Sequence, residues 1–146
     1  MPGMLSTHFA QLEFERDGEM PDSCVIPYRH LCEDILEPIR SHVGEPLRIL
    51  SGYRSPSANQ AAGGVSGSQH VATADYCAAD WWVPTLDMRG VFNWIRLESK
   101  LPFDQLILEH GDHNDIIHTS WSTTPRRMAL EGATANRTGY QSWPVV

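Results

Sequence analysis

An aspartate stands inside an apolar run that follows a polar, glycine- and serine-rich loop. The run Ala79-Asp80-Trp81-Trp82-Val83 predicts a buried strand that Pro84 ends, and the loop before it carries His70. A short loop brings this histidine and this aspartate close together. Neutral imidazole and carboxylate both suit Zn²⁺, so His70 and Asp80 together make half of a metal site.

Composition limits the class of protein. The chain has 146 residues, 41% hydrophobic and 20% charged, which predicts one soluble domain spanning residues 1–146. The formal net charge is −7 and the basic residues are scattered, which argues against nucleic acid as a partner. No apolar run is long enough to span a membrane, and the first residues lack the pattern of a secretory signal. Three cysteines without CxxC spacing predict neither a disulfide framework nor a zinc finger.

Periodicity and turn residues predict a compact α+β domain with helices packed on an antiparallel sheet. A helix is expected from about Pro27 to Val43, kinked at Pro38 and ended by Gly44. The other expected helices are 56–62, capped by Ser55, and 86–100, capped by Thr85. The expected strands are 47–51, 79–83, 105–109, 116–120 and an edge strand over 127–130, with a hairpin turn at 111–114.

Two further stretches, one around Arg54 and one from His113 to His118, complete a candidate peptidase site. Peptide hydrolysis by zinc needs three protein ligands, an open position for water, and a base. The candidates for the ligands are His70, Asp80 and His118, with Asp115 as the base and Arg54 as a cation for a substrate carboxylate or an oxyanion. Each alone has a plainer interpretation, as a polar loop residue, a core histidine, a turn residue or a surface ion pair.

Taken together, the motifs resemble the M15 family of zinc D-alanyl-D-alanine carboxypeptidases and related phage endolysins. The resemblance runs from His8-Phe9 to Gly139-Tyr140. The motifs that carry it are Ser51-Gly52-Tyr53-Arg54-Ser55, Asn59, Gly63-Gly64, Ser68-Gln69-His70, Ala78-Ala79-Asp80, Phe103-Asp104-Gln105-Leu106-Ile107, Glu109 and Ile117-His118-Thr119-Ser120.

The resemblance implies roles for single residues. It places the zinc ligands on His70, Asp80 and His118, and the acidic catalytic residue on Asp115, three residues before the last ligand. It also implies an assisting histidine at His113, a substrate-orienting arginine at Arg54 and a serine at the substrate edge, Ser68. The implied fold is a small α+β domain of the hedgehog and D-Ala-D-Ala peptidase type.

The chain departs from the family pattern between the first two ligands. The family has aspartate seven residues after the first histidine, where this chain has Cys77, and glycine where it has Thr73. A three-residue insertion would make Asp80 the ligand, and we favour it because the apolar run after Asp80 also fits. Cys77 as a thiolate ligand and Asp75 as the ligand are the alternatives. Glu109 competes with Asp115 for the role of base.

These observations predict a zinc metallopeptidase that cuts a D-amino-acid-containing bond of bacterial peptidoglycan, as a D-Ala-D-Ala carboxypeptidase or an L-Ala-D-Glu endopeptidase. We expect a monomer of phage or prophage origin, made in the cytoplasm and acting on the cell wall after release or as part of a virion. One rival is a non-catalytic zinc-binding tail or wall-binding component with the same fold. A second is a thiol enzyme with Cys77 as nucleophile.

Overall fold

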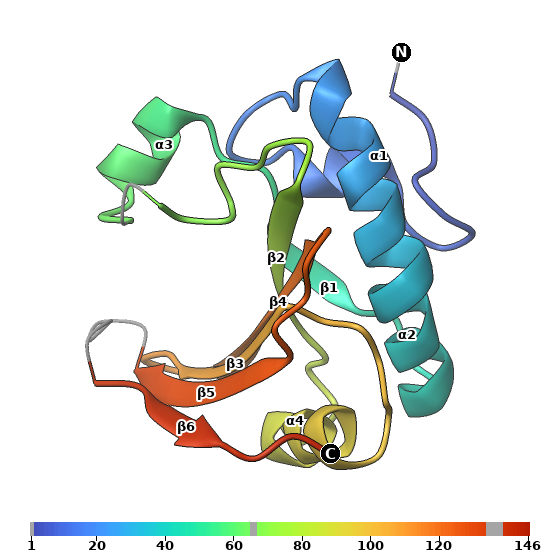
Figure 1. The fold of residues 1–146 in the computed structure, drawn as a ribbon, viewed down its shortest axis with the longest axis vertical. Coiled ribbons are helices and arrows are strands. Elements are labelled where there is room, and N and C mark those ends of the chain that lie inside the picture. The colour runs from blue at the N-terminus through green and yellow to red at the C-terminus, as the bar shows by residue number, and fades with distance from the viewer. Residues whose placement is uncertain (1, 65–66, 134–138) are drawn as a thin grey trace.

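A six-stranded mixed sheet forms the centre of the molecule, in the order β1-β2-β4-β3-β5-β6 (Figure 1). The computed structural model describes residues 2–64, 67–133 and 139–146. The strands are β1 (Arg48–Ser51), β2 (Tyr76–Trp82), β3 (Gln105–His110), β4 (Asp115–Ser122), β5 (Met128–Ala133) and β6 (Gln141–Trp143).

The expected α+β class is confirmed, but the sheet is not antiparallel throughout. Strand β5 pairs with β3 in parallel, and the other neighbouring pairs are antiparallel. The reason is that the chain leaves β4 and passes across the end of β3 before it enters β5. This path also places β5 between β3 and β6, so it is not the edge strand that the sequence predicts.

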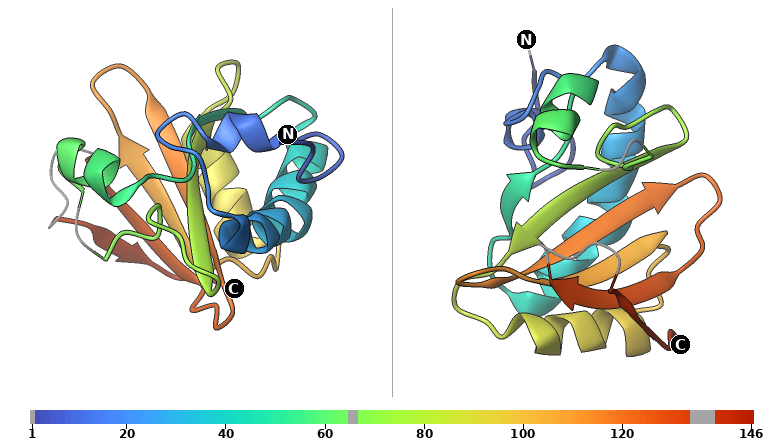
Figure 2. Two further views of the ribbon diagram at one scale, coloured as in Figure 1. Left: turned by 90° about the horizontal axis from the view of Figure 1, so that it is seen from above. Right: turned by 90° about the vertical axis from the view of Figure 1, so that its left-hand side faces the viewer.

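Helices cover one face of the sheet. Helix α1 (Asp22–Leu31) packs against β2 and β4, and α4 (Met88–Leu97) packs against β3 and β4. Figure 2 shows α1 and α2 (Glu37–Val43) on one side of the sheet and α3 (Pro56–Ala61) on the other. Within the described residues, every helix is too short or too polar to cross a membrane.

The first helix is longer than its sequence signals suggest. It begins at Asp22 rather than near Pro27, and a π-helical segment (Cys32–Leu36) joins α1 to α2. Pro38 is the second residue after this segment and has no N–H to donate to the carbonyl of Asp34, which explains why the regular pattern breaks here. Helix α2 ends at Gly44, whose φ of 72° is the left-handed conformation that suits glycine.

One of the two predicted N-terminal helix caps is present and the other is replaced. Ser55 caps α3 as expected, since its side chain accepts a hydrogen bond from the Ala58 amide at 3.1 Å. Helix α4 begins later than predicted, and Asp87 caps it in place of Thr85 by accepting a hydrogen bond from the Arg89 amide at 3.2 Å.

Alternation along β2 separates the core from the site. Cys77, Ala79 and Trp81 are buried among the core residues that face the helices, and the Trp81 indole donates to Thr119 at 3.1 Å. Because successive side chains of a strand point to opposite faces, Asp80 lies on the other face, which α1, α2 and α4 leave uncovered. That face carries the candidate site.

Candidate metal centre

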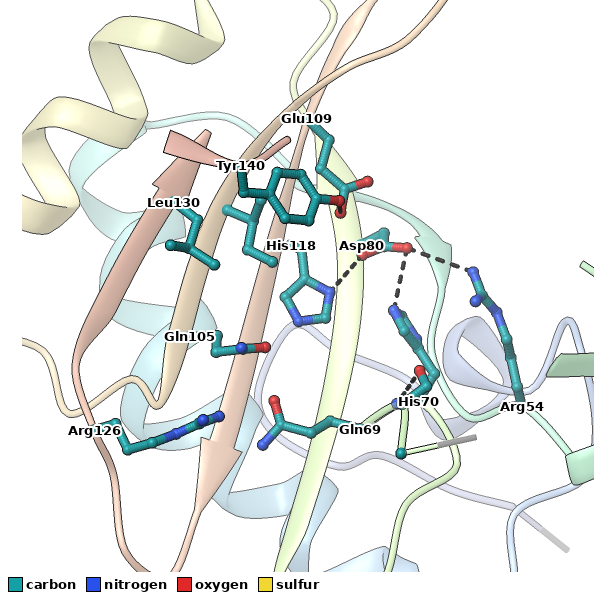
Figure 3. A pocket seen from close by; sticks show the side chains of 13 residues that line it. Arg54, Gln69, His70, Asp80, Gln105, Glu109, His118, Arg126, Leu130 and Tyr140 are labelled. Carbon is teal, nitrogen blue, oxygen red and sulfur yellow. Dashed lines mark hydrogen bonds and ion pairs between the residues drawn. The ribbon is translucent and has the colours of Figure 1, made fainter. Parts of the chain in front are cut away.

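His70, Asp80 and His118 meet on the uncovered face of the sheet (Figure 3). Asp80 on β2 lies directly across from His118 on β4 in the strand register. One carboxylate oxygen of Asp80 lies 3.0 Å from Nδ1 of His118, and the other lies 3.2 Å from Nε2 of His70. All three residues are buried. The structure therefore brings together the three metal ligands that the sequence predicts.

His70 comes from a loop that is held against the end of β1. Its Nδ1 lies 2.7 Å from the carbonyl oxygen of Gly52, and its own carbonyl accepts a hydrogen bond from the Arg54 amide at 2.8 Å. Gly52 itself packs against the backbone of Phe14, where only a glycine fits, since a Cβ there would lie 2.6 Å from Cα of Phe14. A hydrogen bond from Nδ1–H to the Gly52 carbonyl leaves Nε2 of His70 facing Asp80.

Asp80 is held as a carboxylate. Burial raises the pKa of Asp80, but the neighbouring His70 and the hydrogen bonds from both histidines outweigh burial and bring the pKa well below its ordinary value. For His70, burial lowers the pKa while the Asp80 carboxylate raises it, and the net direction is upward. The carboxylate thus draws positive charge toward this cluster.

The donor set fits a zinc ion. Nε2 of His118 is buried and has no hydrogen-bond partner among the described residues. If His70 is neutral and carries its proton on Nδ1, the lone pair of Nε2 points at the Asp80 carboxylate. Nε2 and the carboxylate are then both hydrogen-bond acceptors, and a cation bound between them would hold them together. Two imidazoles and one carboxylate are a ligand set that zinc accepts while keeping a position open.

A cavity of about 330 Å³ opens above the cluster. Arg54, the predicted substrate-orienting cation, and Ser68, the serine predicted at the substrate edge, both line it. Its other lining residues are Gly67, Gln69, His70, Asp80, Gln105, Ile107, Glu109, His118, Arg126, Leu130 and Tyr140.

Arg54 connects the cluster to the N-terminal segment. Its Nη2 lies 3.6 Å from the Asp80 carboxylate, and its Nε lies 3.7 Å from the Asp17 carboxylate and donates to the Ser51 hydroxyl at 3.2 Å. The Ser51 hydroxyl in turn donates to Asp17 at 2.7 Å. The guanidinium is therefore fixed in place at one side of the cavity.

The structure does not bring Asp115 or His113 to the cluster. Asp115 lies three residues before His118 in the same strand, so the two side chains point to opposite faces of the sheet. The Asp115 carboxylate instead lies 2.8 Å from Nδ1 of His110. His113 is exposed in the turn between β3 and β4, and neither residue lines the cavity. This placement separates the predicted base from the predicted ligands.

Glu109, unlike Asp115, lies at the cavity beside the metal cluster. Its strand register with Ile116 puts it on the same face as His118, and it is 9% exposed at the cavity wall. The Tyr140 hydroxyl lies 3.5 Å from one oxygen of this carboxylate. A Cβ on Gly132 would collide with the Tyr140 ring, so the absence of a side chain there gives the ring its position. The sequence analysis gave Glu109 as a competitor of Asp115 for the role of base, and the Asp-x-x-His spacing favoured Asp115.

The two alternative ligands lie elsewhere. Cys77 is completely buried on the helix face of β2, and burial raises the pKa of its thiol well above the ordinary value. Asp75 is exposed in the loop before β2. A buried thiol with a raised pKa is also a poor nucleophile, which weighs against the thiol-enzyme interpretation.

Three lining residues from the C-terminal part of the chain are among those that were not assigned a role from the sequence. Arg126, Leu130 and Tyr140 come from the segment that enters β5 and leads into β6, where periodic signals are weak. Arg126 forms an ion pair with the buried Asp104 of the Phe103-Asp104-Gln105 motif, but a pair of residues 22 positions apart cannot be recognised from sequence spacing alone.

Comparison with known proteins gives one family. The model of the family described as Peptidase M15 matches residues 7–120, which is more than half of the chain. No curated protein matches the chain. The matched stretch contains the whole His70–Asp80–His118 cluster together with Arg54 and Glu109, whereas Arg126 and Tyr140 lie beyond it.

Proposed function

The chain belongs to the peptidase M15 family, and on this basis we propose that it is a zinc metallopeptidase that hydrolyses a D-amino-acid-containing bond of bacterial peptidoglycan. The observation that carries the proposal is the buried His70–Asp80–His118 cluster at the floor of an open cavity, with one imidazole nitrogen of His118 left unpaired among the described residues. Family membership implies a peptidase, and M15 peptidases are generally zinc-dependent.

The residues around the cluster divide the chemical work. When bound to His70, Asp80 and His118, zinc would supply Lewis-acid activation of water and of the scissile carbonyl. Glu109 takes the proton of the attacking water and returns it to the nitrogen of the leaving amine. Arg54 holds a carboxylate of the substrate or the developing oxyanion, since its guanidinium is fixed in position by Asp17 and Ser51.

The substrate follows from the resemblance of the motifs. D-Ala-D-Ala carboxypeptidase and L-Ala-D-Glu endopeptidase action use the same metal chemistry and differ in the peptide that the cavity accepts. A peptidoglycan stem peptide suits the cavity because Arg54 supplies a cation for its carboxylates. Under this proposal the protein is a phage-type wall hydrolase that acts as a monomer, outside the cytoplasm in which it is made.

The proposal is tested by measuring zinc and activity on matched aspartate variants. Asp80→Asn removes a charged ligand, whereas Asp75→Asn makes the same chemical change at an exposed position five residues earlier. We expect wild type and Asp75→Asn to bind one zinc per chain, to gain thermal stability on zinc addition, and to release fragments from purified cell walls. At 100 times its dissociation constant, zinc stabilises a protein by about 2.7 kcal/mol.

Asp80→Asn should lose the zinc, the stability gain and the activity together. Mass spectrometry of the wall digest identifies the bond that is cut. Zinc bound by Asp80→Asn as tightly as by wild type would contradict the ligand assignment. Stoichiometric zinc with no released fragment would instead favour the non-catalytic wall-binding component.

A further inference from the structure

Arg126 forms the wall of the cavity on the β5 side and is held there by a buried carboxylate. Its Nε and Nη2 donate to the two oxygens of Asp104 at 2.9 and 2.7 Å, and its backbone amide donates to the same carboxylate at 2.9 Å. Asp104 is 1% exposed and also accepts a hydrogen bond from Gln69 at 2.7 Å. The position of the guanidinium is thus fixed before any ligand arrives.

The pairing uses one edge of the guanidinium and leaves the other edge for a ligand. Arginine has five N–H donors in a planar fork, and the bonds from Nε and Nη2 to Asp104 use two of them. None of the described residues accepts a hydrogen bond from Nη1, and the side chain is 52% exposed where it lines the cavity. The free Nη1–Nη2 edge has the geometry that binds a carboxylate through two parallel hydrogen bonds.

Arg126 and Arg54 lie on opposite sides of the metal cluster. Arg54 follows β1 and Arg126 precedes β5, so strands β2, β4 and β3 lie between them in the sheet. Figure 3 shows the two arginines on either side of His118 and Asp80. The protein carries a net charge of −7, yet its cavity has a cation at each end.

We infer that Arg126 forms a second carboxylate subsite, so that the preferred substrate is a peptide with one carboxylate on each side of the bond that is cut. Arg54 takes the carboxylate on one side and Arg126 takes the other. This inference rests on the proposed peptidase function and adds the substrate class. In a stem peptide ending in D-Ala-D-Ala, the terminal carboxylate and a diaminopimelate or D-Glu carboxylate meet this requirement.

Synthetic stem pentapeptides that differ by one charge test the inference. The parent is L-Ala-γ-D-Glu-diaminopimelate-D-Ala-D-Ala, and three derivatives each replace one carboxylate by a carboxamide. Cleavage by the zinc-loaded protein is followed by mass spectrometry, and binding is measured separately by calorimetry. We expect one of the two internal carboxylates to matter for wild type, with its amidation raising KM and Kd by roughly ten- to hundredfold, the range for a charged hydrogen bond.

Arg126→Gln should bind the parent as weakly as wild type binds that amidated derivative, and should no longer distinguish the two peptides. Arg127→Gln is the matched control, because Arg127 donates to the carbonyls of Leu101 and Val146 instead of lining the cavity. Arg126→Lys keeps the charge but not the fork, and should retain part of the preference. Zinc content and thermal unfolding identify any variant that fails to fold.

The outcomes separate this inference from the proposed function. Equal binding of the parent and both internally amidated peptides by wild type would overturn the subsite, as would an unchanged preference in Arg126→Gln. If wild type cleaves none of the peptides but binds them with the expected preference, the subsite stands and the proposed hydrolysis fails.

Discussion

Glu109 and Asp115 both lie near the turn that joins β3 and β4, but their carboxylates have different neighbours. Glu109 lines the cavity above the metal cluster beside the Tyr140 hydroxyl. Asp115 lies on the helix face, where it pairs with His110. A general base must reach the proton that it removes, so the cavity position is the reason that we propose Glu109 as the base.

We therefore predict that Glu109→Gln retains zinc and loses activity. The amide keeps the shape of the side chain but cannot take a proton from water, so cleavage should slow by roughly 100- to 10,000-fold, the range for loss of a general base. Zinc analysis and the rate of wall digestion check this expectation.

The matched change at the other carboxylate is Asp115→Asn. It should leave the cleavage rate nearly unchanged and lower the free energy of unfolding by about 1 kcal/mol, because it weakens the hydrogen bond to His110. The reverse pattern, with Asp115→Asn inactive and Glu109→Gln active, would restore Asp115 as the base.

At the level of elements, the junction between β1 and α3 positions the first metal ligand. Gly52 presents its carbonyl to His70, and the next residue, Tyr53, donates its amide to the Phe14 carbonyl at 2.9 Å. The backbone of Phe14 fills the space where a side chain at position 52 would lie. The N-terminal segment, the junction and the His70 loop therefore form one packed unit.

Gly52→Ala should disturb this unit. The added methyl group must displace the Phe14 backbone, so we expect the free energy of unfolding to fall by about 1 to 3 kcal/mol. A displaced Gly52 carbonyl also weakens the orientation of His70, and zinc affinity should drop by roughly 10- to 100-fold. Urea denaturation of the zinc-free protein and competition with a zinc chelator measure the two effects. Gly3→Ala, where a Cβ meets no atom within 4 Å, is the control and should change neither quantity.

The elements of the fold were largely predictable because they depend on local patterns. The Leu31–Val43 stripe, the Ser55 cap and the turn residues at 111–114 each act within a few residues of sequence. The strand faces at the site were harder to derive. An Asp-x-x-His spacing suggests one cleft, but within a strand an odd spacing puts the two side chains on opposite faces. Asp80 and His118 meet only through the β2–β4 register, which long-range pairing determines.

At the scale of the whole molecule, the C-terminal part of the chain forms one wall of the cavity. Leu130 and Tyr140 belong to the segment that forms β5 and β6, and Arg126 precedes it. Sequence spacing could not assign these residues, because β5 pairs in parallel with β3 across an intervening connection. The family match covers the metal cluster but not this wall. The metal cluster and this wall of the cavity therefore come from different parts of the chain.

A charge network on the helix face ties the same C-terminal strands to the rest of the protein. Glu131 on β5 pairs with Arg89 of α4, accepts a hydrogen bond from the Trp143 indole at 3.0 Å, and lies 2.6 Å from Nε2 of His110. Hydrogen bonds to the Asp115 and Glu131 carboxylates raise the pKa of His110. The Arg89 hydrogen bonds, followed by those of His110 and Trp143, lower the pKa of Glu131 from 4.5 to about 2 against the effect of burial.

This network predicts a loss of stability in acid that depends on Glu131. Because its folded-state pKa lies below the ordinary value of 4.5, the carboxylate stabilises the fold above pH 4.5, and this contribution disappears as the pH falls toward 2. Glu131→Gln should lower the free energy of unfolding at pH 7 by about 2 kcal/mol, the scale of a hydrogen bond to a charged group. It should also make the decline of the free energy of unfolding between pH 4.5 and 2 shallower than in wild type.

Urea denaturation of the zinc-free proteins across this pH range provides the measurement, with the exposed Glu98→Gln as the control that keeps the wild-type slope. Parallel pH profiles for wild type and Glu131→Gln would show that the stability of the C-terminal strands does not depend on this carboxylate.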